Sequence, residues 1–285
     1  MKKVLVHLHI YYRDQTDYFI GKLSNICGCE WDLYVTMTEL NSETESKLLS
    51  FKPDAHIMKV ENRGYDVWPF IRVLKSVDLD KYDYILKLHT KNRSDASSRI
   101  NGLSLDNYKW RDELVNPLLK SKKIFLKLLD IFDRYPEVGL MCSHLLYKHI
   151  SNGLKEDMSK LDNELKRLGL NVKDKKFCAG TMFIARSAPY KLFQNDGLID
   201  IGLFSDIPHS HSIGSMAHVY ERILTMVVNA AGYKVKPIII NWVKSIYIIV
   251  AYSVQPVFQK IFSIRRQGED RIKILTLFGF RFKIK

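Results

Sequence analysis

Short runs of apolar residues alternate along the first part of the chain with segments whose apolar residues recur at helical spacing. Residues 4–10 (VLVHLHI) form a mostly apolar, β-branched run that is typical of a buried strand. Further strands are predicted at residues 31–36, 55–60 and 84–88, and helices at residues 16–26, 43–49 and 66–77. This alternation predicts an α/β fold with a mainly parallel sheet flanked by helices. Ligands of such sheets bind beyond the carboxyl ends of the strands.

The second half of the chain continues the alternation with longer helical segments. Helices are predicted at residues 110–134, 156–168 and 216–231, strands at 138–142 and 181–185, and a loop at 200–216. Neither an internal repeat nor a low-complexity linker is evident, so we place one boundary, near residue 240. The chain is thereby divided into a main domain, residues 1–240, and a tail, residues 241–285.

The tail has a pattern of its own. Residues 245–264 are apolar and aromatic, and two arginines follow them. Residues 280–285 (FRFKIK) alternate apolar and cationic side chains, which places three apolar groups on one face of a strand and three cations on the other. Two interpretations remain open: an edge strand packed on the main domain, or a peripheral contact with an anionic membrane surface.

The net charge of the 285 residues, +13 at pH 7, indicates an anionic partner. That partner could be nucleic acid, an anionic membrane or a phosphorylated substrate. Residues 241–285 carry nine Lys/Arg and two acidic residues, so about half of the excess lies in the tail. No RNA- or DNA-binding motif is present, which makes nucleic acid the least favoured of the three.

Features that report on the cellular compartment point to the cytoplasm. The four cysteines show no disulfide spacing and are expected to be reduced thiols. The first residues lack the apolar segment of a signal peptide. The longest apolar run, residues 246–254, is far shorter than the roughly 20 residues that span a bilayer. We therefore expect a cytoplasmic protein, with any membrane contact peripheral and on the inner face of the plasma membrane.

A charged cluster, residues 61–66 (ENRGYD), lies between a predicted strand and a predicted helix, where backbone amides favour an anion. Gly64 permits a turn with positive φ, and Arg63 can form paired hydrogen bonds with phosphate or carboxylate. In the alternative interpretation, Asp66 only caps the next helix and Arg63 pairs with Glu61.

The strand at residues 84–88 leads into His89, Thr90 and Lys91. His89 can donate a hydrogen bond to a diphosphate, and Lys91 supplies a fixed positive charge. Together they could stabilise a departing nucleotide, so this triplet does not support a divalent metal ion as cofactor. The alternative is an ordinary polar strand end.

Two further sets of residues suggest catalysis. His7 and His9 share one face of the first strand and could be metal ligands, which leaves a metal-dependent hydrolase as an alternative. No HExxH or comparable spacing supports that site. His218 and Glu221 share one face of a helix, and Glu221 is a candidate general base. A surface ion pair of Glu221 with Arg222 or Arg186 is the plainer interpretation. A non-catalytic anion- or membrane-binding protein is the other alternative.

Taken in order, these motifs resemble a known family. They are VHLHIYY at 6–12, LYVT at 33–36, ENRGYDVWPF at 61–70, YDYILKLHTK at 82–91, WR at 110–111, CAGTMFIAR at 178–186 and AHVYERIL at 217–224. The series resembles the rhamnan synthesis protein F family of bacterial cell-surface polysaccharide glycosyltransferases. The resemblance implies a GT-A-like catalytic domain over residues 1–240. It further implies transfer of a sugar such as rhamnose from a nucleotide-sugar donor to a polyprenyl-linked glycan acceptor, as in O-antigen or lipopolysaccharide synthesis.

The resemblance also implies roles for individual residues. The expected donor-binding residues are His9, Thr36, Asn62, Arg63, Gly64, Asp66, Thr90 and Lys91. The expected acceptor side is Trp110, Arg111, Gly180 and Thr181, and the expected catalytic residues are Glu221, His218 and His89. GT-A transferases place a DxD-like metal site where this chain has His89-Thr90-Lys91, so metal dependence does not carry over. The family's Asp-Gly-Thr is replaced here by Ile213-Gly214-Ser215. If that Asp is catalytic in the family, either Glu221 carries the role of base here or this member has an altered activity.

Overall fold

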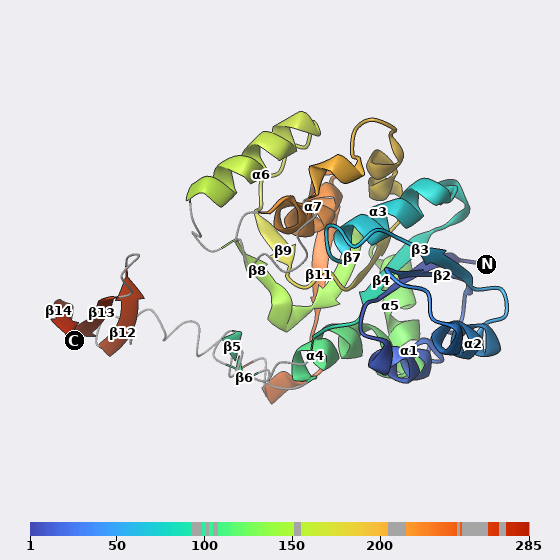
Figure 1. Ribbon diagram of the computed structural model, residues 1–285, viewed down its shortest axis with the longest axis horizontal. Coiled ribbons are helices and arrows are strands. Elements are labelled where there is room, and N and C mark those ends of the chain that lie inside the picture. Colours follow the sequence, from blue (N-terminus) through green and yellow to red (C-terminus); the bar gives the residue numbers. More distant parts are fainter. Residues whose placement is uncertain are drawn as a thin grey trace. The chain divides into compact units, whose positions relative to one another are not determined.

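The computed structural model describes most of the chain and divides it into two compact units (Figure 1). The described residues are 1–92, 99–100, 103–104, 108–150, 155–204, 215–243, 246, 262–267 and 272–284. One unit comprises Met1–Arg93 and Asn107–Ile240, and the other comprises Ser94–Asp106 and Asn241–Lys285. Catalysis by residues 1–240 and membrane contact by residues 241–285 stay predictions.

The larger unit is built on a seven-stranded sheet with the order β11-β7-β10-β4-β1-β2-β3. Its strands are β1 (Lys3–Ile10), β2 (Glu30–Met37), β3 (His56–Lys59), β4 (Tyr84–His89), β7 (Val138–Ser143), β10 (Phe183–Arg186) and β11 (Lys234–Ile238). All neighbouring pairs are parallel except those of β10, which runs antiparallel to both β4 and β7.

Helices cover both faces of this sheet. They are α1 (Thr16–Leu23), α2 (Ser42–Phe51), α3 (Val67–Ser76), α4 (Lys109–Leu119), α5 (Lys122–Arg134), α6 (Lys155–Arg167) and α7 (Met216–Ala230). In Figure 1, α3, α6 and α7 lie on one side of the sheet, and α1, α4 and α5 lie on the other. The predicted α/β fold, a mainly parallel sheet flanked by helices, is confirmed. None of the helices within the described residues is long and apolar enough to cross a membrane.

Short elements complete the larger unit. They are the strands β8 (Tyr147–His149) and β9 (Lys176–Cys178), and the 3₁₀ turns η1 (Arg13–Gln15), η2 (Leu79–Lys81), η3 (His144–Leu146), η4 (Ala188–Gln194) and η5 (Ile201–Leu203). The antiparallel pair of β8 and β9 packs on α7. Since β9 runs directly into the turn before β10, this hairpin helps to place that turn beside α7.

Two predicted boundaries are wrong for physical reasons. The helix predicted over residues 110–134 is two helices, because Ser121 caps α5 by accepting a hydrogen bond from the Ile124 amide at 3.3 Å. The strand predicted at residues 181–185 begins only at Phe183. Gly180 and Thr181 have φ angles of 84° and 47°, in the left-handed region, and a strand cannot run through them.

The central strands β1 and β4 are buried on both faces, and both carry polar residues within their apolar runs. In register, His7 lies beside Lys87 and His9 beside His89. Side chains alternate along a strand, so these four residues lie on the face that also carries Leu5 and Ile85. Leu5 and Ile85 pack with α3 and α7 in the main core. A row of polar groups thus runs beneath α3 and α7 toward the carboxyl ends of the strands.

The smaller unit contains a three-stranded antiparallel sheet in the order β12-β13-β14. The strands are β12 (Phe262–Gln267), β13 (Ile272–Leu277) and β14 (Phe280–Ile284), and the same unit holds β5 (Arg99–Ile100) and β6 (Leu103–Ser104). The strand predicted at the C-terminus is therefore present as β14. Most of the apolar stretch at residues 245–264 lies outside the described residues.

Candidate functional site

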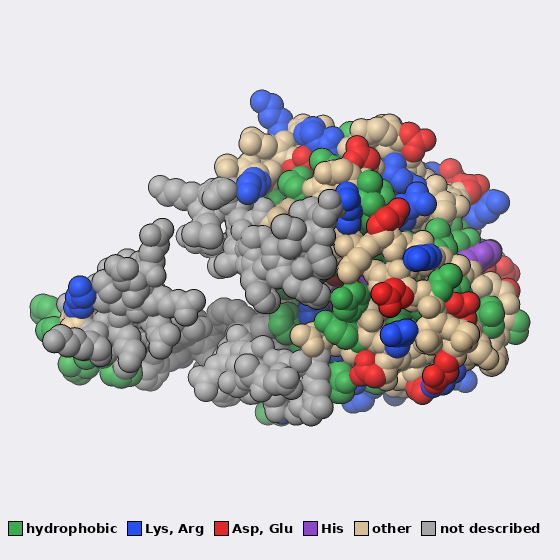
Figure 2. All heavy atoms as spheres, in the orientation of Figure 1, with side chains coloured by type: hydrophobic (Ala, Val, Ile, Leu, Met, Phe, Trp, Pro, Cys, Tyr) green, Lys and Arg blue, Asp and Glu red, His purple; other side chains and the backbone are tan. Residues whose placement is uncertain are grey.

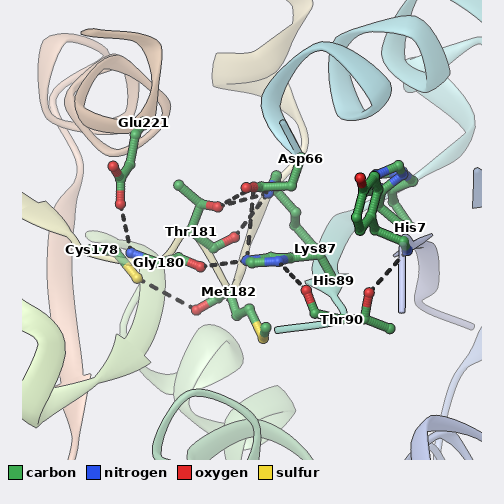
Figure 3. Close-up of polar contacts among 12 residues, drawn as sticks. His7, Asp66, Lys87, His89, Thr90, Cys178, Gly180, Thr181, Met182 and Glu221 are labelled. Atoms are coloured by element: carbon green, nitrogen blue, oxygen red, sulfur yellow. Dashed lines mark hydrogen bonds and ion pairs between the residues drawn. The ribbon is translucent and has the colours of Figure 1, made fainter. Parts of the chain in front are cut away.

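The carboxyl ends of β1, β2 and β4 meet at one edge of the sheet, because these strands are parallel neighbours. They bring His9, Thr36 and His89 to this edge. Antiparallel β10 begins where β4 ends, so the turn that precedes it, residues 178–182, arrives at the same place. The resulting cluster of polar contacts is shown in Figure 3.

His7 and His9 both contact the hydroxyl of Thr36. Thr36 Oγ1 lies 2.9 Å from His7 Nε2 and 3.0 Å from His9 Nδ1. Burial lowers the pKa of His9 to about 3 and holds the pKa of His7 well below its ordinary value, so both rings are neutral at pH 7. Among the residues that the structure describes, no group of three or more His, Cys, Asp or Glu is placed to hold a metal ion.

Asp66 immediately precedes α3, but its side chain makes no capping hydrogen bond. Its Oδ2 instead accepts from Lys87 Nζ at 2.5 Å and from the hydroxyl of Thr181 (Figure 3). The interpretation that Asp66 only caps a helix is therefore wrong. Burial alone would raise the pKa of this carboxyl, but His89 and Lys87 hold it below its ordinary value, so Asp66 is a carboxylate.

Gly64 makes the turn that delivers Asp66. Its φ of 63° lies in the left-handed region, and a Cβ at this position would come within 2.9 Å of the Phe204 ring. Tyr65 follows with a φ of 52°, so two successive left-handed residues redirect the chain into α3. On the other side of this turn, Asn62 is exposed and Arg63 is half-buried. Both are thus at the protein surface next to the Asp66 carboxylate, which is 18% exposed.

His89 is 4% exposed and contacts backbone with both ring nitrogens. Nε2 lies 2.8 Å from the carbonyl oxygen of Gly180, and Nδ1 lies 3.0 Å from that of Thr90. Burial lowers the pKa of His89 to about 4, although Asp66, 3.8 Å away, opposes that shift. A neutral ring donates to only one of the two carbonyls. The expected contact with a diphosphate would therefore require the ring to exchange one of its backbone partners.

Thr90 and Lys91 connect the end of β4 to the end of β1. The Thr90 hydroxyl accepts from the backbone amides of Tyr11 and Tyr12, at 2.9 Å and 3.0 Å. The Lys91 carbonyl accepts from Gln15 Nε2 at 2.7 Å. Thr90 thus fixes backbone, whereas the Lys91 ammonium lies 4.5 Å from the ring centroid of Trp110.

Trp110 and Arg111, the residues expected on the acceptor side, begin α4. The Arg111 guanidinium contacts two rings, with its carbon 3.4 Å from the ring centroid of Tyr18 and 4.2 Å from that of Tyr108. It also pairs with Asp112 at 3.0 Å and is only 8% exposed. Arg111 therefore supports an aromatic cluster next to Lys91, and Trp110 is the member of the pair that contacts Lys91.

Glu221, on the second turn of α7, faces the turn before β10 (Figure 3). Its Oε1 accepts from the Gly180 amide at 2.7 Å. The plainer interpretation was an ion pair of Glu221 with Arg222 or Arg186. Arg186 Nε and Nη2 donate instead to the backbone carbonyls of Val138 and Phe132, and Arg222 Nε and Nη1 have no hydrogen-bond partner within the described residues. A carboxylate that accepts one backbone hydrogen bond keeps its second oxygen for another partner.

His218, one turn earlier on α7, contacts residues outside the buried cluster. Its Nδ1 lies 2.8 Å from Ser215 Oγ, and its ring centroid lies 5.9 Å from that of Tyr65. The start of α7 therefore contacts the 61–66 turn through His218 and the 178–182 turn through Glu221.

The structure brings most of the predicted residues to one place and adds Lys87, which the sequence did not single out. Lys87 is fully buried and contacts both Asp66 and Thr181. One signal was available: it is the only charged residue within an otherwise apolar strand, and it shares a face with His89. Asn62, Arg63 and Lys91 lie at the rim of this cluster rather than within it.

The chain is similar to one family and to two curated proteins. The family model for RgpF, rhamnan synthesis protein F, matches residues 1–233. "Uncharacterized protein WxcX" of Xanthomonas campestris pv. campestris, from strains B100 and ATCC 33913, is 27% identical over 239 residues. These alignments cover 81% of this chain and 32% of each relative. The chain thus spans about a third of the length of the curated relatives that it matches.

Among solved structures, the chain is similar to TarS of S. aureus. A crystal structure of TarS matches with a TM-score of 0.43 and 14% identity, covering 83% of this chain and 35% of that one. Residues 1–349 of TarS in complex with UDP-GlcNAc match with a TM-score of 0.36 and 14% identity, covering 67% and 47%. These TM-scores are too low for fold or function to be inferred from them.

Proposed function

Because the chain belongs to the rhamnan synthesis protein F family, we propose that it is a glycosyltransferase that uses a nucleotide-diphosphate sugar. The observation that carries this proposal is the convergence of four separate motifs at the carboxyl edge of the sheet. Hydrogen bonds and close contacts link one residue from each motif there: Asp66, His89, Gly180 and Glu221. Ligands of mainly parallel sheets bind at this edge.

The proposed reaction is a displacement at the anomeric carbon of the donor sugar. A hydroxyl of the acceptor forms the new bond to that carbon, and the bond to the diphosphate oxygen breaks with its electron pair. The other oxygen of Glu221, Oε2, takes the proton of the hydroxyl while Oε1 stays on the Gly180 amide. A single displacement of this kind inverts the configuration at the anomeric carbon.

The proposed donor site lies beside the buried cluster. Arg63 and Lys91, at its rim, supply positive charge to the leaving diphosphate, and His89 is available when its ring exchanges a carbonyl for a phosphate oxygen. The second oxygen of Asp66 has no hydrogen-bond donor within the described part of the chain, and the side chain is 18% exposed. It suits a hydroxyl of the nucleotide ribose or of the sugar.

The finer parts of the proposal concern the acceptor and the membrane. We propose that the acceptor is a polyprenyl-linked glycan and that rhamnose is a candidate sugar. The tail is suited to the membrane surface that such an acceptor requires, because its three-stranded sheet places apolar residues in cross-strand rows. One row consists of Phe262, Leu277 and Phe280, and the next row on the same face includes Leu275 and Phe282. With its net positive charge, this segment suits an anionic membrane.

The first experiment is a thermal-shift assay of the whole chain with candidate donors. UDP, GDP, dTDP and their sugar conjugates, dTDP-rhamnose included, are tested with and without Mg²⁺ or Mn²⁺. A ligand that binds the native state raises its melting temperature by mass action, by an amount set by its concentration relative to Kd. We expect one nucleotide to stabilise the protein without added metal.

The same assay tests the competing hypotheses. Stabilisation by Zn²⁺ or Mn²⁺ alone, lost in His9→Ala, would favour a metal-dependent hydrolase centred on His7 and His9. Stabilisation by inorganic phosphate and by every nucleotide to the same extent would favour a non-catalytic anion-binding protein.

A further inference from the structure

Lys87 is a buried cation whose bonding capacity is fully used. It is 0% exposed, and its ammonium group has three hydrogens and three described acceptors. These are Asp66 Oδ2 at 2.5 Å, Thr181 Oγ1 at 2.8 Å and the Thr181 carbonyl oxygen at 3.1 Å (Figure 3). A buried ion pair of this kind is weak grounds for a stabilising role, because an apolar pair of similar volume is often as stable. The role of Lys87 is therefore better inferred from the groups to which it donates hydrogen bonds than from its charge.

What Lys87 holds is an unfavourable turn. Gly180 and Thr181 are successive left-handed residues, and Thr181 has a side chain that resists this conformation. Lys87 bonds both the carbonyl and the hydroxyl of Thr181, and Asp66 accepts from the same hydroxyl. The ion pair of Lys87 and Asp66 thus holds Thr181 in this conformation.

The Gly180–Thr181 turn holds the candidate catalytic groups in position. The Gly180 amide donates to Glu221, and the Gly180 carbonyl contacts His89. A rotation of the peptide groups around Gly180 and Thr181 would move both contacts together. A continuous chain of bonds therefore runs from Lys87 through Thr181 and Gly180 to Glu221.

We propose that Lys87 is a positioning residue, which holds Asp66 and the Gly180–Thr181 turn so that Glu221 points at the acceptor hydroxyl. Lys87 itself touches neither substrate. The inference rests on the proposed glycosyltransferase activity for its catalytic consequence. Its structural content, the control of one turn by one buried lysine, can be measured without any turnover.

The test compares Lys87→Met with wild type in the whole chain, at a temperature where both are folded. Amide hydrogen exchange at residues 178–182 should rise at least tenfold, with exchange in β1 unchanged. Release of nucleoside diphosphate from UDP-glucose, UDP-GlcNAc, GDP-mannose or dTDP-rhamnose gives the kinetics. For whichever donor is used, kcat should fall about 100-fold with KM within threefold, as for a residue that acts through the general base.

Lys3→Met is the matched control, because Lys3 forms an ion pair with Asp32 at 2.8 Å at the opposite end of the same sheet. It should change neither exchange at residues 178–182 nor kcat. If Lys87→Met does not fold, the pair variant Lys87→Met/Asp66→Asn leaves no buried charge unpaired and should show the same local increase in exchange.

The outcomes separate the inference from the proposed function. Unchanged exchange at residues 178–182 overturns the inference, whatever the kinetics. An equal rise in exchange across all strands, with kcat per folded molecule unchanged, shows a purely structural lysine and also overturns it. Absence of turnover in wild type with every donor overturns the proposed function, and with it the catalytic consequence; the local rise in exchange would then establish only that Lys87 holds the turn.

Discussion

At the scale of single residues, the site combines three neutral histidines with one buried ion pair. The pKa of His9 is lowered to about 3 and that of His89 to about 4, and that of His7 is also well below its ordinary value. Burial is the main cause for all three. Protonation of these histidines is therefore coupled to unfolding, and the free energy of unfolding should depend on pH.

We expect acid to destabilise the protein well above the pH at which carboxylates titrate. In the unfolded chain these histidines take up protons near their ordinary pKa of 6.5. In the native state the pKa is about 3 for His9 and about 4 for His89, and that of His7 is also well below its ordinary value. Below pH 6.5 the unfolded state thus binds more protons, and each histidine lowers the free energy of unfolding by up to about 1.4 kcal/mol per pH unit. Urea unfolding between pH 7.5 and 5 measures this slope.

The control for this prediction is His9→Gln. It should reduce the slope of unfolding free energy against pH by the contribution of about one proton. His149→Gln, at an exposed position, is the matched comparison for the substitution itself. Unfolding free energies that do not vary between pH 7.5 and 5 would contradict the buried, neutral assignment of the histidines.

Glu221→Gln tests the general base. The amide oxygen of glutamine still accepts from the Gly180 amide, so the melting temperature should change little, but glutamine cannot take a proton. We expect kcat for donor turnover to fall by about 10² to 10⁴ with KM within a few-fold. Glu43→Gln, on the exposed start of α2, is the control. Full activity in Glu221→Gln would remove this residue from the mechanism.

The sequence predicted which residues lie at the carboxyl edge of the sheet, but it did not predict which groups they contact there. Asp66, His89 and Glu221 were singled out because they follow strands or lie on a helix face, and both properties are local. The position of Lys87 in the cluster was not predictable in this way. A lysine in an apolar strand has no local signature of its partner, and here that partner is 21 residues away along the chain.

At the scale of elements, the 178–182 turn is the part of the fold where sequence pattern and structure differ most. Its apolar residues resemble a strand, and the pattern contains no sign of the left-handed pair that delays β10. Contacts of Thr181 with Lys87 and Asp66, both distant in sequence, select that conformation. The strands β1 to β4 and β7 and the helices α1 to α3, α6 and α7 lie within a few residues of their predicted bounds, because their periodicity is set by burial on one or both faces. The short strands β8 and β9 and the edge strand β11 were not predicted from the sequence.

Gly180→Ala should destabilise the protein and lower its activity. A φ of 84° costs alanine roughly 1 to 2 kcal/mol, and the added Cβ would lie 2.9 Å from the Leu114 side chain, which must move. Gly232→Ala is a matched control with a φ of 86° and nothing within 4 Å of the added atom.

Urea unfolding and donor turnover measure both variants. We expect Gly232→Ala to lose only the cost of its backbone conformation and to keep full activity. Equal turnover in the two variants would mean that the turn does not position Glu221.

At the scale of the whole molecule, the positive charge is not gathered on the main domain face that Figure 2 shows. Lysine and arginine side chains are interspersed there with aspartate and glutamate. The tail combines its excess of cations with exposed aromatic groups, since Phe280 is 71% exposed and Phe282 is 50% exposed. The sequence predicted the alternation of β14, but it gave no indication that β12 and β13 extend the apolar rows.

Replacing two of these aromatic groups should weaken membrane binding. We expect the whole chain to bind vesicles that contain phosphatidylglycerol and to release them at high salt. Phe280→Asp/Phe282→Asp should reduce binding at least tenfold in a flotation assay. In a matched pair of single variants, Thr276→Asp adds one negative charge on the opposite face of the sheet and should reduce binding less than Phe282→Asp. Equal losses in the two single variants would indicate that charge alone governs binding.

The antiparallel direction of β10 has a consequence for how changes elsewhere in the chain affect the site. Because β4 ends and β10 begins at the same edge, the chain between Thr90 and Met182 departs from the site and returns to it. His89 and Gly180 are joined across this gap by a hydrogen bond. The geometry of the site is therefore set by the pairing of β10 with β4, two segments far apart along the chain, and a change that disturbs this pairing is expected to disturb the site even where no site residue is altered.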